Sequence, residues 1–419
     1  MIKILLAIYF FTPKFNLINI PGFVTGIRLD DIAVLGIIIL FALKGRIPRI
    51  IKDRLIFFYL LPILFAFLVN IQFISLWNLL SFLRVIEYVV VSIAVYHFLN
   101  FKELIIGIKA YLILNFIFCL GQIAFGFPGF ASIGLIYDLT RLYGLTGGAW
   151  ELGAFAAIAA CLIAINDSTY KNSRPSYSWY VLCMALIILS SSRSQLLTLP
   201  FIFLTFLGLS FDNSFKNITR IKGIIYLLPV TIAGFFGIDY FFYSLQNVGA
   251  DRGTDLVARS VELFSLENLT IFSDLINEQF IVSTREGIEA GKTWFVDYGS
   301  HPDADDSFLI RAYKWTAVVK ILFQNPFYLI FGLGPGSLGD ALDGGFLRSF
   351  AEYGFLMLLF YIELFRKFFR FKPWVLILMF FIPTMIFIDI HLSSKIQPLI
   401  LAMALFSNKI ITYSDETSN

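Results

Sequence analysis

Apolar runs long enough to cross a lipid bilayer recur along nearly the whole chain of 419 residues, and one polar segment interrupts them. A straight crossing by an α-helix takes about 20 predominantly apolar residues. We expect spans near residues 2–12, 31–45, 55–74, 82–99, 105–126, 147–166, 178–191, 195–211, 222–243, 346–365, 373–389 and 394–411. The interruption, from about Gln246 to Arg311, is rich in charged residues. The pattern predicts an all-α polytopic membrane protein with about 12 transmembrane helices and one large external loop.

This pattern also divides the chain into three parts. Residues 1–245 are predicted to form an N-terminal transmembrane bundle, residues 246–345 the external loop, and residues 346–419 the C-terminal transmembrane helices. Within the loop, residues 308–323 place apolar and basic positions at helical spacing, which predicts an amphipathic helix. The glycines of Gly332–Gly336 predict a turn after that helix.

Composition and charge support the same class of protein. The chain is 58% hydrophobic and 15% charged, whereas soluble domains have roughly 25% charged residues. Its basic residues gather at Lys44–Arg54, Lys216–Lys222 and Arg366–Lys372. Because each cluster directly borders an apolar run, we expect no nucleic-acid partner.

The basic clusters also predict the orientation of the helices. Short loops rich in Lys and Arg stay on the cytoplasmic side of a membrane. If all three clusters face the cytoplasm, both chain termini do as well, and residues 127–141, 190–194 and 246–345 lie outside.

Three arginines, Arg141, Arg193 and Arg311, fall on the predicted external face. Arginine at mid-bilayer costs at least ~2.5–3.5 kcal/mol on insertion scales, so Arg193, in a short serine-rich turn, should lie near the interface or in a polar cavity. Alternatively, Arg141 extends its guanidinium to the membrane surface, and Arg311 belongs to a helix lying on lipid headgroups. A guanidinium can also bind phosphate through two parallel hydrogen bonds. Together the three predict an anionic ligand, such as a lipid-linked diphosphate, at this face.

Two acidic segments are candidate metal sites. Asp30 and Asp31 could hold a cation, but their position at the start of a predicted span favours helix capping. The segment His301–Asp306 combines one histidine with three carboxylates, and acidic loop residues of this kind are usually solvated. We therefore expect neither a metal ion nor another cofactor.

The order of several short motifs resembles the bacterial O-antigen polymerase and ligase superfamily. These motifs are Arg141-Leu-Tyr-Gly-Leu-Thr-Gly-Gly, Ser190-Ser-Ser-Arg-Ser194, Arg311 with Trp315, Asn325–Gly336, Phe346–Gly354 and, as in the polymerases, Arg28-Leu-Asp-Asp31. The resemblance implies a GT-C-like, metal-independent glycosyltransferase in the bacterial inner membrane. Its substrate would be an oligosaccharide linked to undecaprenyl diphosphate. Its partners would be membrane lipids, and whether a chain-length regulator also binds stays open.

The resemblance also implies roles for individual residues. Arg141, Arg193 and Arg311 would bind the donor diphosphate and stabilise the charge of the leaving group. The ligases carry a histidine after the Gly-x-Gly turn, whereas the matching stretch here, Asp340–Phe346, has none. This difference argues against a ligase and leaves the general base unassigned. The expected function is a repeat-unit polymerase for a surface polysaccharide, and the alternative within the same chemistry is an O-antigen ligase that transfers the glycan to another acceptor.

Other residues near these motifs are candidates for the general base and for substrate binding. Asp343 is a candidate catalytic base, as is Glu352, although Glu352 is expected to pair with Arg348 one helical turn earlier. The candidates for substrate binding are Lys314, Trp315, His301, Arg348 and Glu352. A transporter or flippase of lipid-linked oligosaccharides is the alternative from another class. It would place polar residues in both leaflets, whereas here they gather on one predicted face.

Overall fold

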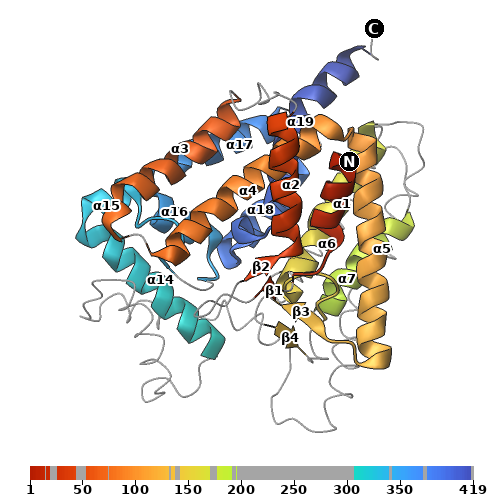
Figure 1. Cartoon of the computed structure of the whole chain (residues 1–419), viewed down its shortest axis with the longest axis horizontal. Coiled ribbons are helices and arrows are strands. Elements are labelled where there is room, and N and C mark those ends of the chain that lie inside the picture. Colours follow the sequence, from red (N-terminus) through yellow and green to blue (C-terminus); the bar gives the residue numbers. More distant parts are fainter. Residues whose placement is uncertain are drawn as a thin grey trace, which may run out of the picture.

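The computed structural model is mostly helical and describes twelve segments of the chain (Figure 1). These are residues 1–14, 16–18, 26–43, 53–73, 75–131, 134–136, 142–169, 177–190, 195, 306–338, 342–370 and 375–416. Apart from Gln195, the predicted spans at 195–211 and 222–243 lie outside the described residues, as does most of the predicted external loop.

Among the described residues, seven helices come from the N-terminal half of the chain. They are α1 (Ile2–Phe11), α2 (Leu29–Leu43), α3 (Arg54–Val69), α4 (Leu76–Phe98), α5 (Phe101–Phe125), α6 (Ala149–Thr169) and α7 (Tyr177–Ser190). Short polar sequences start the longest of them. Ser75 and Asn78 form a reciprocal capping box at α4, and Asn100 and Glu103 form another at α5. Helix α5 ends at Gly126, whose φ of 64° is readily adopted by glycine.

Six further helices and two short 3₁₀ turns complete the helical part of the described residues. They are η2 (Ile71–Phe73), α14 (Asp306–Gln324), α15 (Pro326–Phe331), α16 (Gly345–Tyr353), α17 (Met357–Phe369), α18 (Val375–Phe387), η5 (Ile390–Leu392) and α19 (Gln397–Glu416). Helix α14 confirms the helix predicted over residues 308–323.

The single span predicted over residues 346–365 is wrong, because two helices, α16 and α17, occupy it. They are separated at Gly354, which has a φ of 71°. A Cβ atom there would lie 2.1 Å from the carbonyl oxygen of Ile330, so the backbone of α15 approaches too closely for a side chain. Gly354 thus ends α16, and the chain changes direction before α17 begins.

Two short antiparallel hairpins were not predicted. One pairs β1 (Asn16–Ile18) with β2 (Ile27–Arg28), and the other pairs β3 (Gly129–Ala131) with β4 (Gly134–Ile136). Both lie in connections between predicted spans, toward the end of the helices opposite the chain termini (Figure 1). Apart from them, the described residues agree with the all-α expectation.

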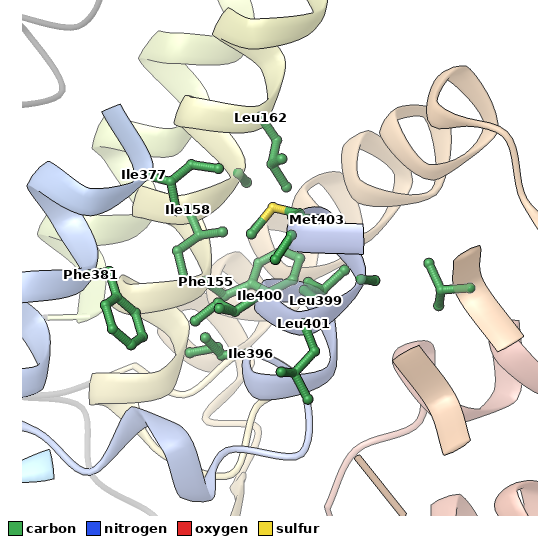
Figure 2. Close-up of a cluster of buried hydrophobic side chains, with 14 of the residues drawn as sticks. Phe155, Ile158, Leu162, Ile377, Phe381, Ile396, Leu399, Ile400, Leu401 and Met403 are labelled. Carbon is green, nitrogen blue, oxygen red and sulfur yellow. The ribbon is translucent and has the colours of Figure 1, made fainter. Parts of the chain in front are cut away.

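The main core extends through most of the described helices, and one part of it lies where α6, α18 and α19 meet (Figure 2). Phe155 and Ile158 of α6 lie against Ile377 and Phe381 of α18, with Ile400 of α19 beside them. Helix α6 is rich in alanine and almost fully buried, which allows its neighbours to approach closely on every side.

Three helices in the described part of the chain are long and apolar enough to cross a membrane. They are Leu76–Phe98, Phe101–Phe125 and Ala149–Asp167. Helix α5 also exposes large apolar side chains, among them Ile106, Ile117 and Phe125, over most of its length. Such a surface is typical of contact with lipid or another protein. The chain is therefore compatible with a helical membrane protein, and the number of about 12 spans stays a prediction.

Ion pairs join helix ends that the charge pattern assigns to one side of the membrane. Lys3 pairs with Glu103 at 2.7 Å, and Asp53 pairs with Lys367 at 2.8 Å. All four residues were predicted to lie at cytoplasmic ends of spans. The opposite ends of several helices enclose a charged cavity.

Candidate functional site

A cavity of about 640 Å³ lies among α2, α4, α16, the start of α6, and the connection between α18 and α19. Its charged lining residues are Lys14, Arg28, Asp31, Arg84, Glu87, Glu151, Arg348, Glu352 and Asp389. Four large aromatic residues, Trp77, Tyr88, Trp150 and Tyr353, complete the lining at different points. In the topology predicted from charge, all of these residues belong to the external ends of their spans.

The first charged group joins the start of α2 to α4. Arg84 lies 2.5 Å from Asp31 and 3.0 Å from Glu87, and Arg28 lies 3.2 Å from Asp30. Asp31 also accepts a hydrogen bond of 2.8 Å from the backbone N–H of Arg28, immediately before the helix. This bond confirms the capping interpretation for Asp31, whereas Asp30 serves mainly as the ion-pair partner of Arg28.

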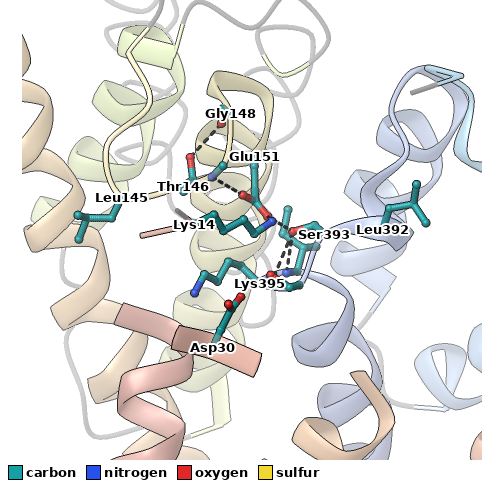
Figure 3. A network of polar contacts seen from close by, with 12 residues as sticks. Lys14, Asp30, Leu145, Thr146, Gly148, Glu151, Leu392, Ser393 and Lys395 are labelled. Atoms are coloured by element: carbon teal, nitrogen blue, oxygen red, sulfur yellow. Dashed lines mark hydrogen bonds and ion pairs between the residues drawn. The ribbon is translucent and has the colours of Figure 1, made fainter. Parts of the chain in front are cut away.

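A second group joins the segment after α1 to the start of α6 and to the connection before α19 (Figure 3). Lys14 pairs with Glu151 at 2.6 Å, and the other oxygen of Glu151 accepts a hydrogen bond of 2.7 Å from the N–H of Gly147. The hydroxyl of Ser393 donates to Glu151 as well. Buried Lys395 donates to backbone carbonyls at the end of α1, so this group fastens α1 to the cavity wall.

The third group lies between α16 and η5. Arg348 pairs with Glu352 at 2.9 Å, which confirms the predicted pair one turn apart. Arg348 also pairs with Asp389 at 3.1 Å. The same Asp389 carboxylate accepts hydrogen bonds from the backbone N–H groups of Leu342, at 2.8 Å, and Gly344, at 3.0 Å. Asp389 thus holds the loop before α16 against the cavity wall.

That loop carries Asp343, the candidate base. Its φ of 55° is the one positive value among the described residues other than glycine. Both Nε and Nη2 of Arg311 bind the Asp343 carboxylate, at 3.0 and 2.8 Å. On the same helix, Trp315 donates from its indole nitrogen to the carbonyl oxygen of Leu342 at 3.0 Å. The structure therefore brings Arg311, Trp315 and Asp343 together at one loop, with Arg311 and Asp343 each partly exposed.

The predicted site residues are distributed between this region and the rest of the chain. Arg348 and Glu352 line the cavity, and the Arg311–Asp343 pair is linked to it through Asp389. Lys314 lies in α14, partly exposed. Arg141, Arg193 and His301 lie outside the described residues, so the convergence of three arginines on one diphosphate stays a prediction.

Sequence reasoning missed several titratable residues that the structure places in or beside the cavity. They are Lys14, Arg84, Glu87, Glu151, Asp389, His391 and Lys395. Most of them lie within or at the edge of apolar runs. A charged residue in such a run is costly and usually functional, so this signal was present in the sequence.

His391, in η5, is 5% exposed, and neither of its ring nitrogens has a hydrogen-bond partner among the described residues. Burial lowers the pKa of His391 to about 4, which the nearby Asp389 carboxylate only partly opposes. The imidazole is therefore neutral at pH 7.

Comparison with family models, curated proteins and solved structures found no match. The chemical character of the site therefore comes from its own side chains. Within the described ranges, no group of three or more histidine, cysteine or acidic residues is arranged to hold a metal ion. The cavity combines guanidinium groups, carboxylates and indole rings, which suits a polar ligand with both hydrogen-bonding groups and apolar faces.

Proposed function

We propose that this protein is an integral membrane glycosyltransferase of the bacterial inner membrane. It polymerises oligosaccharide repeat units, linked to undecaprenyl diphosphate, into a surface polysaccharide such as O-antigen or capsule. The observation that carries the proposal is the cavity of about 640 Å³ with its paired charges and indole rings. The motif order described above supports the same assignment.

The cavity has features that suit a glycan. Its volume falls within the roughly 300–1,000 Å³ of typical ligand sites. Carboxylates such as Glu87 and Glu352 accept hydrogen bonds from sugar hydroxyls. The rings of Trp77 and Trp150 offer apolar surface for the C–H faces of a pyranose. Aliphatic or purely acidic cavities lack this combination.

In the proposed reaction, a hydroxyl of the acceptor sugar attacks the anomeric carbon of the donor. The bond between that carbon and the diphosphate oxygen breaks, and the diphosphate leaves with the bonding electrons. A carboxylate takes the hydroxyl proton, and guanidinium groups stabilise the charge on the departing diphosphate. No metal is required for this balance.

The Arg311–Asp343 pair suits both roles. In the structure the two side chains form an ion pair, with 2.8 Å between Nη2 of Arg311 and the Asp343 carboxylate. A diphosphate that engages Arg311 competes with Asp343 for the guanidinium. Donor binding would then release the Asp343 carboxylate to act as a base beside the reacting atoms. Glu352 remains the second candidate base, because it lines the cavity itself.

The proposal is tested by complementation of a strain that lacks the gene. Arg311→Lys keeps the charge and loses the planar fork, so the variant should make surface polysaccharide with a single repeat in place of a ladder. Removal of such a contact by Arg311→Ala should lower transfer by around 10²–10³-fold. Arg366→Lys is the matched control, because Arg366 pairs with Glu363 away from the cavity. A full ladder from the gene-deletion strain would contradict the proposed function.

Transport of lipid-linked oligosaccharide is a second candidate, favoured by the many buried ion pairs in the described helices. Charged residues in membrane-embedded positions mark transport paths as well as catalytic sites. The two functions differ in their product. Purified protein in liposomes would lengthen the glycan if it is a polymerase, and would only move it between leaflets if it is a transporter.

A further inference from the structure

We infer that the cavity is a sugar subsite selective for hydroxyl and ammonium donors, and that it excludes the diphosphate. The inference rests on the proposed function and adds which part of the substrate enters. It is carried by two features of the cavity: the pairing of its charges, and two carboxylate oxygens with no partner.

The basic residues of the lining are already neutralised. Four basic and five acidic side chains line the cavity: Lys14, Arg28, Arg84 and Arg348, against Asp31, Glu87, Glu151, Glu352 and Asp389. Each of the four basic groups has a carboxylate within 3.2 Å. A diphosphate entering here would compete with the carboxylate that already lies beside each basic group, and would face an excess of negative charge. The lining is therefore unsuited to a polyanion.

Two carboxylates of the lining have one oxygen in an ion pair and one oxygen without a hydrogen-bond partner among the described residues. Glu87 binds Arg84 through Oε2, and its Oε1 is buried with no hydrogen-bond partner among the described residues. Glu352 binds Arg348 through Oε1, and its Oε2 is also buried with no hydrogen-bond partner among the described residues. Glu87 is 8% exposed and Glu352 is fully buried. A buried carboxylate oxygen that lacks a donor is unfavourable, so both atoms favour a ligand that supplies donors.

Sugar hydroxyls and protonated amino groups are such donors, whereas the oxygens of a phosphate at neutral pH are mainly acceptors. Trp77 and Trp150 add apolar surface suited to the C–H faces of a pyranose ring. Diphosphate recognition is then left to groups elsewhere, such as Arg311, which is not part of the cavity lining. The ligand is divided between two subsites of opposite preference.

The test measures binding of the two halves of the substrate separately. The full-length protein is purified in detergent, and intrinsic tryptophan fluorescence reports binding, since Trp77 and Trp150 line the cavity. One probe is the lipid-free repeat-unit oligosaccharide, released by mild acid from the lipid-linked pool of the host cell. The other probe is inorganic pyrophosphate. The oligosaccharide should quench the fluorescence saturably, and pyrophosphate should not compete with it for binding.

The key variant is Glu87→Gln, which removes the negative charge at nearly constant shape. Loss of a hydrogen bond to a charged acceptor should weaken oligosaccharide binding about tenfold or more. Glu363→Gln is the matched control: Glu363 also pairs with an arginine three residues away, but both its oxygens are engaged and it lies outside the cavity. It should bind the oligosaccharide like the wild type.

A variant that fails to fold would not obscure the result. Glu87→Asp keeps a negative charge that can pair with Arg84, so this variant should fold. Its carboxylate is withdrawn by one methylene, so it should bind the oligosaccharide more weakly than the wild type does. Wild-type affinity in both Glu87 variants, or displacement of the oligosaccharide by pyrophosphate, would overturn the inference. Absence of oligosaccharide binding to the wild type would also overturn it. The proposed function would survive these outcomes if the gene were still required for the polysaccharide ladder.

Discussion

Asp389 and Arg348 form an ion pair of 3.1 Å across 41 positions of sequence, and both side chains are almost fully buried. Because the same carboxylate binds the backbone of the loop before α16, this pair couples the cavity wall to the loop that carries Asp343. The position of the candidate base therefore depends on a residue that follows it by 46 positions.

Replacement of Asp389 should affect stability and activity together. Asp389→Ala removes one of the two carboxylates that pair with Arg348 and the acceptor for the backbone N–H groups of Leu342, Asp343 and Gly344. Loss of one partner of a buried ion pair costs about 3–5 kcal/mol. Asp389→Asn keeps one acceptor oxygen and should lose less. Thermal unfolding in detergent measures both variants. An Ala variant as stable as the wild type would show that the loop is held by other contacts.

Two substitutions of Asp343 distinguish the contribution of its backbone conformation to stability from the contribution of its carboxylate to activity. Its φ of 55° is tolerated by asparagine but strained for alanine, at roughly 1–2 kcal/mol. We therefore expect Asp343→Asn to unfold near the wild-type temperature and Asp343→Ala to unfold earlier. If the carboxylate is the base, both should lose polymer formation in the complementation assay. Full activity of the folded Asn variant would transfer the role of base to Glu352.

His391 should make stability depend on pH. Its pKa in the folded protein, about 4, lies below the ordinary value of 6.5, so the unfolded chain binds the proton more readily. The stabilisation from neutral His391 is present above pH 6.5 and is lost as pH falls toward 4. Unfolding temperatures between pH 7.5 and 4.5 should therefore fall less steeply in His391→Gln than in the wild type. A His97→Gln control should match the wild type, because His97 is exposed. Identical profiles for all three proteins would contradict this role.

Asp53 and Lys367 connect the start of α3 to the end of α17. Their ion pair is 2.8 Å long, and Lys367 is 2% exposed. Lys367→Asp should destabilise the protein by placing two carboxylates together. Adding Asp53→Lys should restore part of the loss, with a coupling of about 0.5–3 kcal/mol in a double-mutant cycle. Additive effects of the two changes would show that these helix ends are not in contact.

Chelation distinguishes guanidinium groups from a metal ion as the partner of the diphosphate. Polymerisation by purified protein should survive EDTA if Arg311 and the other arginines neutralise the charge. Replacing Asp303, Asp305 and Asp306 together by Asn should also leave most activity. Activity lost to EDTA and restored by magnesium or manganese would assign a cation to this acidic loop or to Asp30 and Asp31.

The sequence alone determined the helical class and many of the local contacts. The length of an apolar run predicts a helix because the backbone must satisfy its own hydrogen bonds in lipid. Residues one turn apart meet on any helix, so the Arg348–Glu352 pair was predictable from spacing. For the same reason, Asp31 was recognisable as a residue at a helix start.

The tertiary structure alone decided which distant charges share the cavity. Arg84 meets Asp31 across 53 positions, and Lys14 meets Glu151 across 137. Hydrophobicity is not directional, so it drives helices together without specifying which run lies beside which. That choice depends on side-chain packing and on close backbone contacts such as the one at Gly354, which divided a predicted span in two. Charge complementarity can pair side chains only where packing places the helix ends within reach of each other.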